Sequence, residues 1–416
     1  MNGWPAERVL NDEGENMKKY TFVDLFAGCG GLSEGFYQEK FESLLHLEID
    51  KDACSTLKTR MKYYKYSDEI VENAVMCEDI TREDILLEID KRIDKQVDVI
   101  IGGPPCQAFS SVGRAQDPNS MGNDPRNYLF ENYLHILNHL KPKIFIFENV
   151  KGILTAHPKG VKIFNLIIKK MRETYKVLDD PKILLLNAVN YGVPQMRERV
   201  IVIGVRNDID IEPEDIYKLI KKTHYAPNEE TNELKKYRTV RDAISDLPKL
   251  MPMEGAEDLY FEDTSDNDYV KELRKQDFNK VYNHRARGHN EKDRERYRIL
   301  SENSWQLKDL QKVRPDLVHH DPKHFGNRYT VQEYDKPGKT VVAHLYKDGN
   351  LFIHPDPKQE RTFTVREAAR VQSFPDDFFF EGARTSQYKQ VGNAVPPLMS
   401  RAFAKAIKKV LDNLEE

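Results

Sequence analysis

One apolar stretch followed by a rigid turn constrains the fold of this chain more than any other feature. Residues 97–101 are rich in β-branched side chains and predict a buried strand. Two glycines and two prolines at 102–105 end that strand, and the prolines hold the backbone extended. Cys106 therefore follows on a stiff loop at the mouth of a strand, which is where open α/β sheets bind ligands. The alternative is a plain turn with an inert buried cysteine.

The same kind of strand recurs along the first half of the chain. Apolar and β-branched runs predict further strands at 20–26, 43–47, 143–150, 183–187 and 200–204. Helices are expected at about 51–61, at about 127–140 and in a closing segment that reaches about residue 411. Several of these strands end in a chemically useful residue, and a parallel sheet would gather those ends along one edge.

A glycine-rich loop at 27–31 follows the first strand, and 32–36 begins a helix. A strand, a glycine loop and a helix in this order are typical of the start of a Rossmann-like nucleotide site. The loop lacks the GxGxxG sequence, however, and a tight turn is the alternative. Glu48 lies about 20 residues further on, where an acidic residue usually binds ribose hydroxyls. Asp79 either accepts a hydrogen bond from an adenine amino group or caps the following helix.

Further along, a carboxylate and two arginines stand beside strands. Glu148 lies at the end of the apolar strand 143–150, and a buried strand seldom ends in an acid that has no function; a solvent-exposed strand end is the alternative. Alternation along the extended segment 195–199 puts Arg197 and Arg199 on one side, unless both belong to a surface charge cluster. The irregular loop 109–122 after Cys106 predicts a lid.

Composition narrows the class of protein. The chain has 416 residues, which suggests two or three domains. Its net charge of −4 argues against nonspecific coating of nucleic acid but allows one basic face. Its four cysteines form no CxxC pair and lie near no histidine cluster, so we expect neither zinc nor disulfides and place the chain in a reducing cytoplasm. We find no signal peptide and no membrane-spanning run.

The character of the sequence changes after about residue 207. The region to about 359 is hydrophilic and lacks the strand–helix rhythm. Within it, 284–298 is basic and carries aromatic residues, and Arg285 and Arg287 there suit contacts with a phosphate backbone. A solvated helix face is the alternative interpretation.

Six motifs in order resemble those of the cytosine-C5 DNA methyltransferases. They are FVDLFAGCGG (22–31), GPPCQ (103–107), ENV (148–150), QMRER (195–199), REAARVQSFP (366–375) and GNAVPP (392–397). The resemblance covers about 20–205 and 361–410, and no motif is broken. It implies an α/β fold in which a Rossmann-like class I methyltransferase domain with a mainly parallel twisted sheet carries a smaller target-recognition domain. We expect a flexible tail at 1–18, a catalytic domain at 19–205 completed by 386–416, and a target-recognition domain at 206–385.

The resemblance also implies S-adenosylmethionine as the cofactor and S-adenosylhomocysteine as the product. Glu48 is then expected at the ribose, Asp79 at the adenine, and Asn393 and Val395 at the methionine end. The full set of expected cofactor contacts is Phe26, Ala27, Gly28, Gly30, Gly31, Leu32, Glu48, Ile49, Asp79, Ile80, Pro105, Asn393 and Val395.

The expected chemistry explains why these residue types are needed. C5 of cytosine is a poor nucleophile until a thiolate, here that of Cys106, adds at C6. Glu148 is expected at N3 of the ring, and Arg197 or Arg199 at O2 or at the thiolate. The base must leave the duplex to be reached. Contacts with the substrate are expected from Gln107, Ser110, Arg285 and Arg287.

We therefore expect a monomeric enzyme that needs no metal and methylates cytosine in a specific duplex DNA sequence, within a microbial restriction–modification system. Three alternatives remain open from the sequence. A related branch of the family methylates cytosine in tRNA, a binding or regulatory protein can keep the fold without catalysis, and a nicotinamide dehydrogenase is disfavoured by the spelling of the glycine loop.

Overall fold

A mainly parallel sheet organises the molecule, which we describe from a computed structural model covering residues 20–105, 129–157, 160–261, 265–318 and 328–414. Within these residues eight strands pair in the order β3-β2-β1-β4-β5-β8-β6, and β7 also pairs with β8. Strands β1 to β5 run parallel, whereas β8 is antiparallel to each of its partners. The strands are β1 (Thr21–Leu25), β2 (Glu42–Glu48), β3 (Val75–Cys77), β4 (Val99–Gly102), β5 (Ile144–Val150), β6 (Tyr175–Val177), β7 (Leu185–Asn187) and β8 (Glu198–Arg206). The predicted α/β class and parallel sheet are confirmed.

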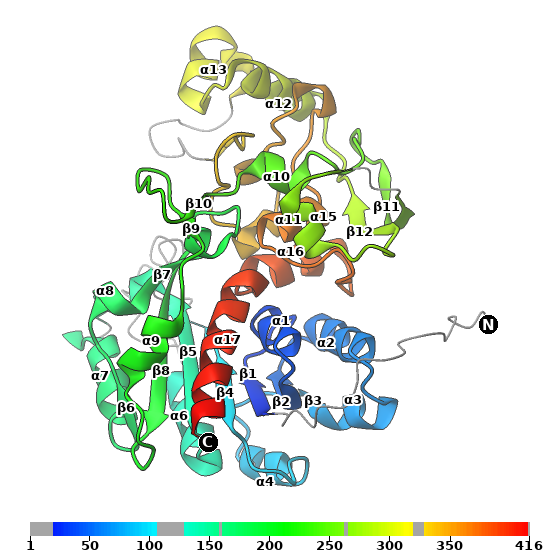
Figure 1. Cartoon of the computed structure of the whole chain (residues 1–416). Coiled ribbons are helices and arrows are strands. Elements are labelled where there is room, and N and C mark those ends of the chain that lie inside the picture. The colour runs from blue at the N-terminus through cyan, green and yellow to red at the C-terminus, as the bar shows by residue number, and fades with distance from the viewer. Residues whose placement is uncertain (1–19, 106–128, 158–159, 262–264, 319–327, 415–416) are drawn as a thin grey trace.

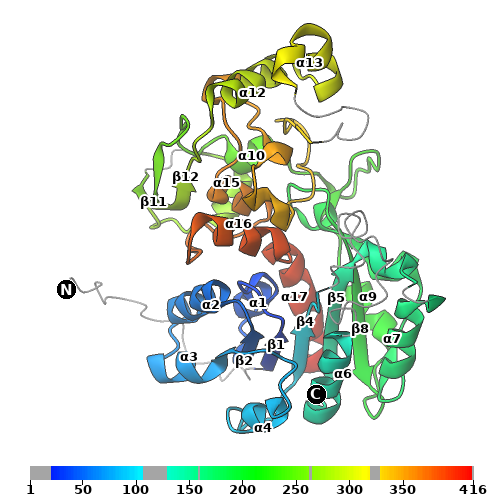
Figure 2. The same cartoon turned by 180° about the vertical axis from the view of Figure 1, so that it is seen from behind.

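Each face of the sheet is covered by helices, because successive side chains of a strand point to opposite faces. Phe22 and Ile101 belong to one core, whereas Val23 and Ile100 belong to the other. The first core is closed by α1 (Gly31–Gln38), α2 (Lys51–Tyr63), α3 (Asp68–Ala74), α9 (Pro213–Leu219) and α17 (Pro397–Asn413). The second is closed by α4 (Ile85–Asp90), α6 (Leu129–Leu140), α7 (Ile163–Met171) and α8 (Pro181–Leu184). Figures 1 and 2 show these layers from opposite sides.

Helix α17 lies directly against α1, although about 360 residues separate them in sequence (Figure 1). The Ser400 hydroxyl donates to the Leu32 carbonyl. A Cβ atom added to Gly35 would lie 2.5 Å from the Ser400 carbonyl carbon and closer still to the Arg401 nitrogen. The two helices therefore touch backbone to backbone, and α17 completes the layer that α1 begins.

A second lobe lies above the sheet in Figure 1. Its elements are β9 (His224–Tyr225), β10 (Lys235–Lys236), α10 (Val240–Ile244), β11 (Gly255–Tyr260), α11 (Asp268–Leu273), β12 (Lys280–Arg285), α12 (Glu291–Asn303), α13 (Leu307–Val313), α15 (Val365–Val371) and α16 (Arg384–Asn393). Helix α9 belongs with the sheet instead: the Tyr217 hydroxyl donates to the Ile201 carbonyl and accepts from the Ile203 amide. Helix α9, which lies beyond residue 206, therefore packs with the sheet.

Buried ion pairs hold the second lobe together. Arg370 of α15 is fully buried and pairs with Asp376 and with Asp246. Arg361 pairs with Glu367 through two hydrogen bonds of 2.7 Å. Burial alone would raise the pKa of Glu367, but the charge of Arg361 lowers that pKa below the usual range. The motif at 366–375 therefore contributes structure to this lobe.

Candidate active site

The ends of the parallel strands gather the predicted residues at one edge of the sheet. The glycine loop follows β1, Glu48 ends β2, and Asp79 follows β3 by two residues. Pro105 follows β4, and Glu148 lies near the end of β5. The candidate site therefore extends along the carboxyl edge from the glycine loop to Glu148.

The glycine loop takes a conformation that favours glycine. Gly28 and Gly30 have φ angles of 55° and 87°, and Phe26, which carries a side chain, has a φ of 60°. Such strain in a bulky residue is typical of functional sites. A Cβ atom on Gly28 would have no atom within 4 Å, whereas one on Gly31 would lie 2.6 Å from the Val395 carbonyl oxygen. The loop is thus open at Gly28 and closed against the chain at Gly31.

Glu48 is held beside this loop by backbone donors. Its Oε2 accepts from the Gly28 amide at 2.8 Å, and its Oε1 accepts from the Ile49 and Asp50 amides at 2.9 Å each. Burial raises the pKa of Glu48, and these amide hydrogen bonds oppose that rise. Next to it, the Ile49 side chain is 63% exposed. A carboxylate and a bare apolar side chain therefore stand together at the end of β2.

Some of the other residues predicted to contact the cofactor are buried or already make hydrogen bonds within the protein. Asp79 Oδ1 accepts from the amide and the hydroxyl of Thr81, so this carboxylate stabilises the turn that follows β3. Leu32 and Ile80 are about 95% buried in the cores, and their side chains face the protein interior. Asn393 is exposed. Only the backbones of Leu32 and Ile80 remain available for the contacts predicted from the sequence.

An ion pair joins β5 and β8 at the far end of the site. Arg199 Nε lies 2.7 Å from Glu148 Oε1, and both side chains are less than 15% exposed. Burial lowers the pKa of Arg199, and the charge of Glu148 opposes that change. A Cβ atom on Gly103 would lie 2.5 Å from Glu148 Oε2. The carboxylate is therefore fixed against the loop that leads to Cys106.

That loop is also tied to the neighbouring strand by Asn149, whose side-chain amide donates to the Pro104 carbonyl at 3.2 Å. Gly103 and Asn149 were not assigned roles from the sequence. Their positions in the sequence could have indicated a role, because each lies close to a predicted site residue at the end of a strand. Cys106, Gln107 and Ser110 themselves lie outside the described residues.

The structure brings Arg199 but not Arg197 to Glu148. Arg197 is fully buried and donates to the carbonyls of Val341 (2.7 Å), Ala394 (2.8 Å) and Gly392 (3.2 Å). Arg197 precedes β8, which begins at Glu198, and the charges of Arg199 and Glu148 still act on its guanidinium. Its hydrogen bonds, however, are with the backbone of segments that are distant in sequence.

Two buried glutamines, also unassigned from the sequence, continue this junction. Gln195 Nε2 donates to Gln372 Oε1 at 2.7 Å, and Gln195 Oε1 accepts from the Val341 amide at 2.7 Å. Gln372 Nε2 in turn donates to the Val391 carbonyl at 2.7 Å. Three of the sequence motifs therefore meet in one hydrogen-bonded junction.

Beneath the glycine loop lies a buried polar network that sequence reasoning missed. Ser33 donates to Asp24 and contacts His46, and His46 Nε2 lies 2.7 Å from the hydroxyls of Tyr37 and Ser43. Burial raises the pKa of Asp24 to about 8 and lowers the pKa of His46 to about 3. Both groups are therefore neutral near pH 7, and the network supports the start of α1 without a buried charge.

The two arginines predicted to contact DNA differ in exposure. Arg285 is exposed at the end of β12. Arg287 is only 7% exposed, donates to the Leu345 carbonyl at 2.9 Å and lies over the Tyr388 ring at 4.4 Å. Its guanidinium is engaged within the protein, so the predicted phosphate contact of Arg287 is not supported.

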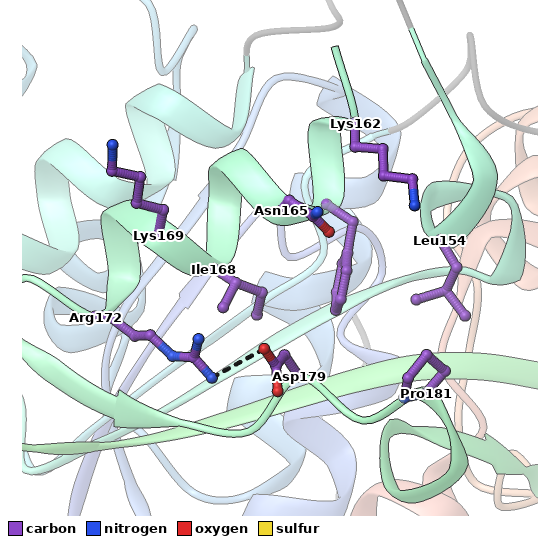
Figure 3. Close-up of a pocket in the computed structure, with 9 residues that line it drawn as sticks. Leu154, Lys162, Asn165, Ile168, Lys169, Arg172, Asp179 and Pro181 are labelled. Atoms are coloured by element: carbon purple, nitrogen blue, oxygen red, sulfur yellow. Dashed lines mark ion pairs between the residues drawn. The ribbon is translucent and has the colours of Figure 1, made fainter.

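A separate hollow of about 500 Å³ lies beside α7 (Figure 3). Lys162, Lys169 and Arg172 line it together with apolar side chains, and Arg172 pairs with Asp179 at 3.1 Å. It contains none of the predicted site residues. Within the described ranges, no three His, Cys, Asp or Glu side chains are placed to hold a metal ion, and no helix there is long and apolar enough to cross a bilayer.

Comparisons with known proteins agree with this geometry. The chain is 37% identical to the type II methyltransferase M.Bpa9945I of Bacillus paralicheniformis, over 94% of this chain and 99% of that protein. It is 36% identical to the type II methyltransferase M.DdeI of Desulfomicrobium norvegicum, over 95% of this chain and 90% of that protein.

Solved structures share the fold. A prophage-encoded E. coli protein described as a DNA modification methyltransferase superposes with a TM-score of 0.68 at 24% identity, covering 95% of this chain and all of that one. The S. pombe Dnmt2 methyltransferase gives 0.52 at 14% identity, covering 94% and 99%. The sequence model of the C-5 cytosine-specific DNA methylases matches residues 20–409. With the strand-edge site and these full-length matches, the chain belongs to the C-5 cytosine-specific DNA methylase family.

Proposed function

We propose that this enzyme transfers a methyl group from S-adenosylmethionine to C5 of a cytosine that is flipped out of a specific duplex DNA sequence. The observation that carries the proposal is the Glu148–Arg199 pair, which is fixed against Gly103 three residues before Cys106. A nucleophile, a carboxyl group and a guanidinium are thereby assigned to one strand edge.

The glycine loop fits the cofactor. Gly28 leaves open space above the loop, and Glu48 beside it has acceptor capacity left for ribose hydroxyls. The exposed Ile49 side chain offers an apolar surface for a purine ring. Asn393 and Val395 close the other end, where Val395 abuts Gly31. When bound, S-adenosylmethionine supplies an electrophilic methyl group.

Cys106 is the nucleophile in this proposal. Its thiolate forms a C–S bond at C6, and the electron pair of the C5–C6 double bond moves into the ring, which makes C5 nucleophilic. After C5 has gained its methyl group, a solvent water takes the proton from C5, the electron pair of that C–H bond re-forms the C5–C6 double bond, and the C–S bond breaks with its electron pair on sulfur. The thiolate is thereby regenerated.

Glu148 and Arg199 stabilise the charge that enters the ring. The Glu148 carboxyl shares a proton with N3, and the Arg199 guanidinium donates to O2. Arg199 already holds Glu148 at 2.7 Å, so both groups are oriented before the base arrives. Removal of one such preorganised donor typically costs about 3 kcal/mol, or roughly a hundredfold in rate.

We infer that the lobe from 221 to about 385 reads the DNA sequence, with Arg285 at a phosphate, and that Gln107 and Ser110 contact the flipped nucleotide. Extrusion of a base costs a few kcal/mol, which the specific contacts of this lobe offset. The names of the relatives indicate restriction–modification, and we propose the same setting here.

A duplex containing 5-fluorocytosine tests the mechanism. Fluorine replaces the hydrogen that must be removed from C5, so the covalent adduct cannot break down. With cofactor present, the wild-type chain should become covalently attached to DNA, seen as a shifted band in a denaturing gel. Cys106→Ala should bind DNA and cofactor but form no adduct and transfer no methyl group. Methyl transfer by Cys106→Ala at the wild-type rate would exclude Cys106 as the nucleophile.

Two further arms define the substrate. Bisulfite sequencing of DNA from cells that express the chain should show one methylated sequence context. Methyl incorporation into tRNA is expected to be negligible beside that into duplex DNA, and the reverse result would overturn the choice of DNA.

A further inference from the structure

The buried Arg197 guanidinium links parts of the chain that are far apart in sequence. We propose that Arg197 is a positioning residue that fixes the methionine end of the cofactor site relative to the catalytic pair Glu148–Arg199. This inference rests on the proposed function and assigns to Arg197 a task other than contact with the base.

The first argument is where its hydrogen bonds go. The carbonyls of Gly392 and Ala394 flank Asn393, which lies in the segment proposed to hold the cofactor. These carbonyls stand at the C-terminus of α16, where the last carbonyls of a helix lack intrahelical partners and carry the negative end of its dipole. One guanidinium therefore satisfies both sides of the proposed cofactor contact.

The second argument is how firmly the other end is held. The Arg197 amide donates to Asn187 Oδ1 at 3.1 Å, and the Arg197 carbonyl accepts from the Ala188 amide at 2.9 Å. Two residues further on, Arg199 contacts Glu148. Arg197 is thus a rigid link between the catalytic strand and the segment around Asn393.

The third argument is geometric selectivity. The fork of Arg197 reaches three carbonyls, the third being that of Val341, which belongs to the second lobe. A lysine keeps the charge but presents a single ammonium and cannot hold three carbonyls in a fixed plane. Arg197→Lys therefore separates the geometry of the link from its charge.

The chain provides a matched control. Arg366 is also fully buried and also donates to three backbone carbonyls, those of Tyr282, Pro375 and Phe378, all within the second lobe. Arg366→Lys should disturb folding to a similar extent. It leaves the segment around Asn393 untouched, so a general effect of losing a buried arginine is distinguishable from loss of the link.

The experiment measures S-adenosylhomocysteine binding to the full chain by isothermal titration calorimetry, with thermal unfolding recorded in parallel. We expect Arg197→Lys to weaken binding at least tenfold and to raise the KM for S-adenosylmethionine to a similar extent. Its affinity for duplex DNA should change less than twofold. Arg366→Lys should lower the melting temperature comparably, with less than a twofold change in S-adenosylhomocysteine affinity.

Unchanged S-adenosylhomocysteine affinity in Arg197→Lys, or an equal loss in Arg366→Lys, overturns the inference. If Arg197→Lys does not fold, the uncharged Arg197→Gln is measured in the same way and judged by the same two criteria. If Arg197→Gln also does not fold, the role is primarily structural and the inference fails. A wild-type chain that does not bind S-adenosylhomocysteine contradicts the proposed function instead, so the two failures are distinguishable.

Discussion

Replacement of Gly35 by alanine tests whether the contact between α1 and α17 is as close as described. The new Cβ would lie 2.5 Å from the Ser400 carbonyl carbon, where carbon atoms normally approach to about 3.5 Å. Two of the three nearest atoms, the Arg401 nitrogen and the Ser400 carbonyl carbon, belong to the backbone of α17, so rotation of the Ser400 side chain cannot relieve the clash. The helix must move by about 1 Å.

Two opposing effects set the size of the change. Overpacking of a well-packed contact typically costs about 1–3 kcal/mol, and backbone obstruction favours the upper end. Alanine is a better helix former than glycine by about 1 kcal/mol, which opposes the loss. We therefore expect a net loss of about 2 kcal/mol, or a fall in melting temperature of roughly 4–8 °C for a domain of 150–250 residues.

Urea unfolding and calorimetric melting measure this loss, with Gly288→Ala as the control. A Cβ on Gly288 meets only the flexible Met253 side chain, with Sδ at 2.7 Å, so its effect should be small. S-adenosylhomocysteine affinity should fall in Gly35→Ala, because α17 begins just after Val395. A Gly35→Ala chain as stable as the wild type would refute the backbone contact.

Three further predictions follow from the site and its surroundings. Gly103→Ala should displace Glu148 and slow single-turnover methyl transfer about a hundredfold, the same loss that we expect for Glu148→Gln, with cofactor and DNA binding retained; a normal rate would show that Glu148 is not fixed by Gly103. Arg285→Ala should weaken DNA binding and reduce its salt slope by about 1, whereas Arg287→Ala should lower stability and leave the slope unchanged; the opposite pattern would contradict their assigned burial. The folded-state pKa of Asp24 is about 8 against 3.8 in the unfolded chain, so the folded protein holds an extra proton and loses stability as pH rises between these values. The lowered pKa of His46, about 3 in the folded protein, makes stability rise with pH, but only below about pH 6.5. Between pH 6.5 and 8 the wild type should therefore lose up to about 2 kcal/mol of unfolding free energy relative to Asp24→Asn. The prediction fails if the unfolding free energies of the two chains, measured with urea, change equally over this pH range.

Local sequence signals predicted the sheet and the edge that holds the site. The leucine-rich run before Glu48 and the isoleucine- and phenylalanine-rich run before Glu148 form strands of the sheet, and the glycine loop after β1 has the expected backbone. These features depend on a few adjacent residues. Glu148 was expected at a strand end for the same reason.

Long-range packing explains what the sequence did not predict. The hydrogen-bond partners of Arg197 lie 144 to 197 residues away, and no local pattern indicates them. Arg287 lies in a basic stretch that suggests exposure, yet the Tyr388 ring and the Leu345 carbonyl cover it. Asp24 lies within an apolar strand, and its hydrogen bond with Ser33 of α1 depends on how the helix packs on that strand.

The backbone contact of α1 with α17 also governs when the enzyme becomes competent during its own synthesis. A ribosome that adds about 5–20 residues per second needs roughly 20–70 seconds to pass from the first of these helices to the second. Until α17 has been synthesised, the apolar surface that it covers on α1 and the sheet stays exposed, and the segment around Asn393 does not yet exist. A nascent or prematurely terminated chain therefore cannot modify DNA, and it presents chaperones and proteases with a half-covered core.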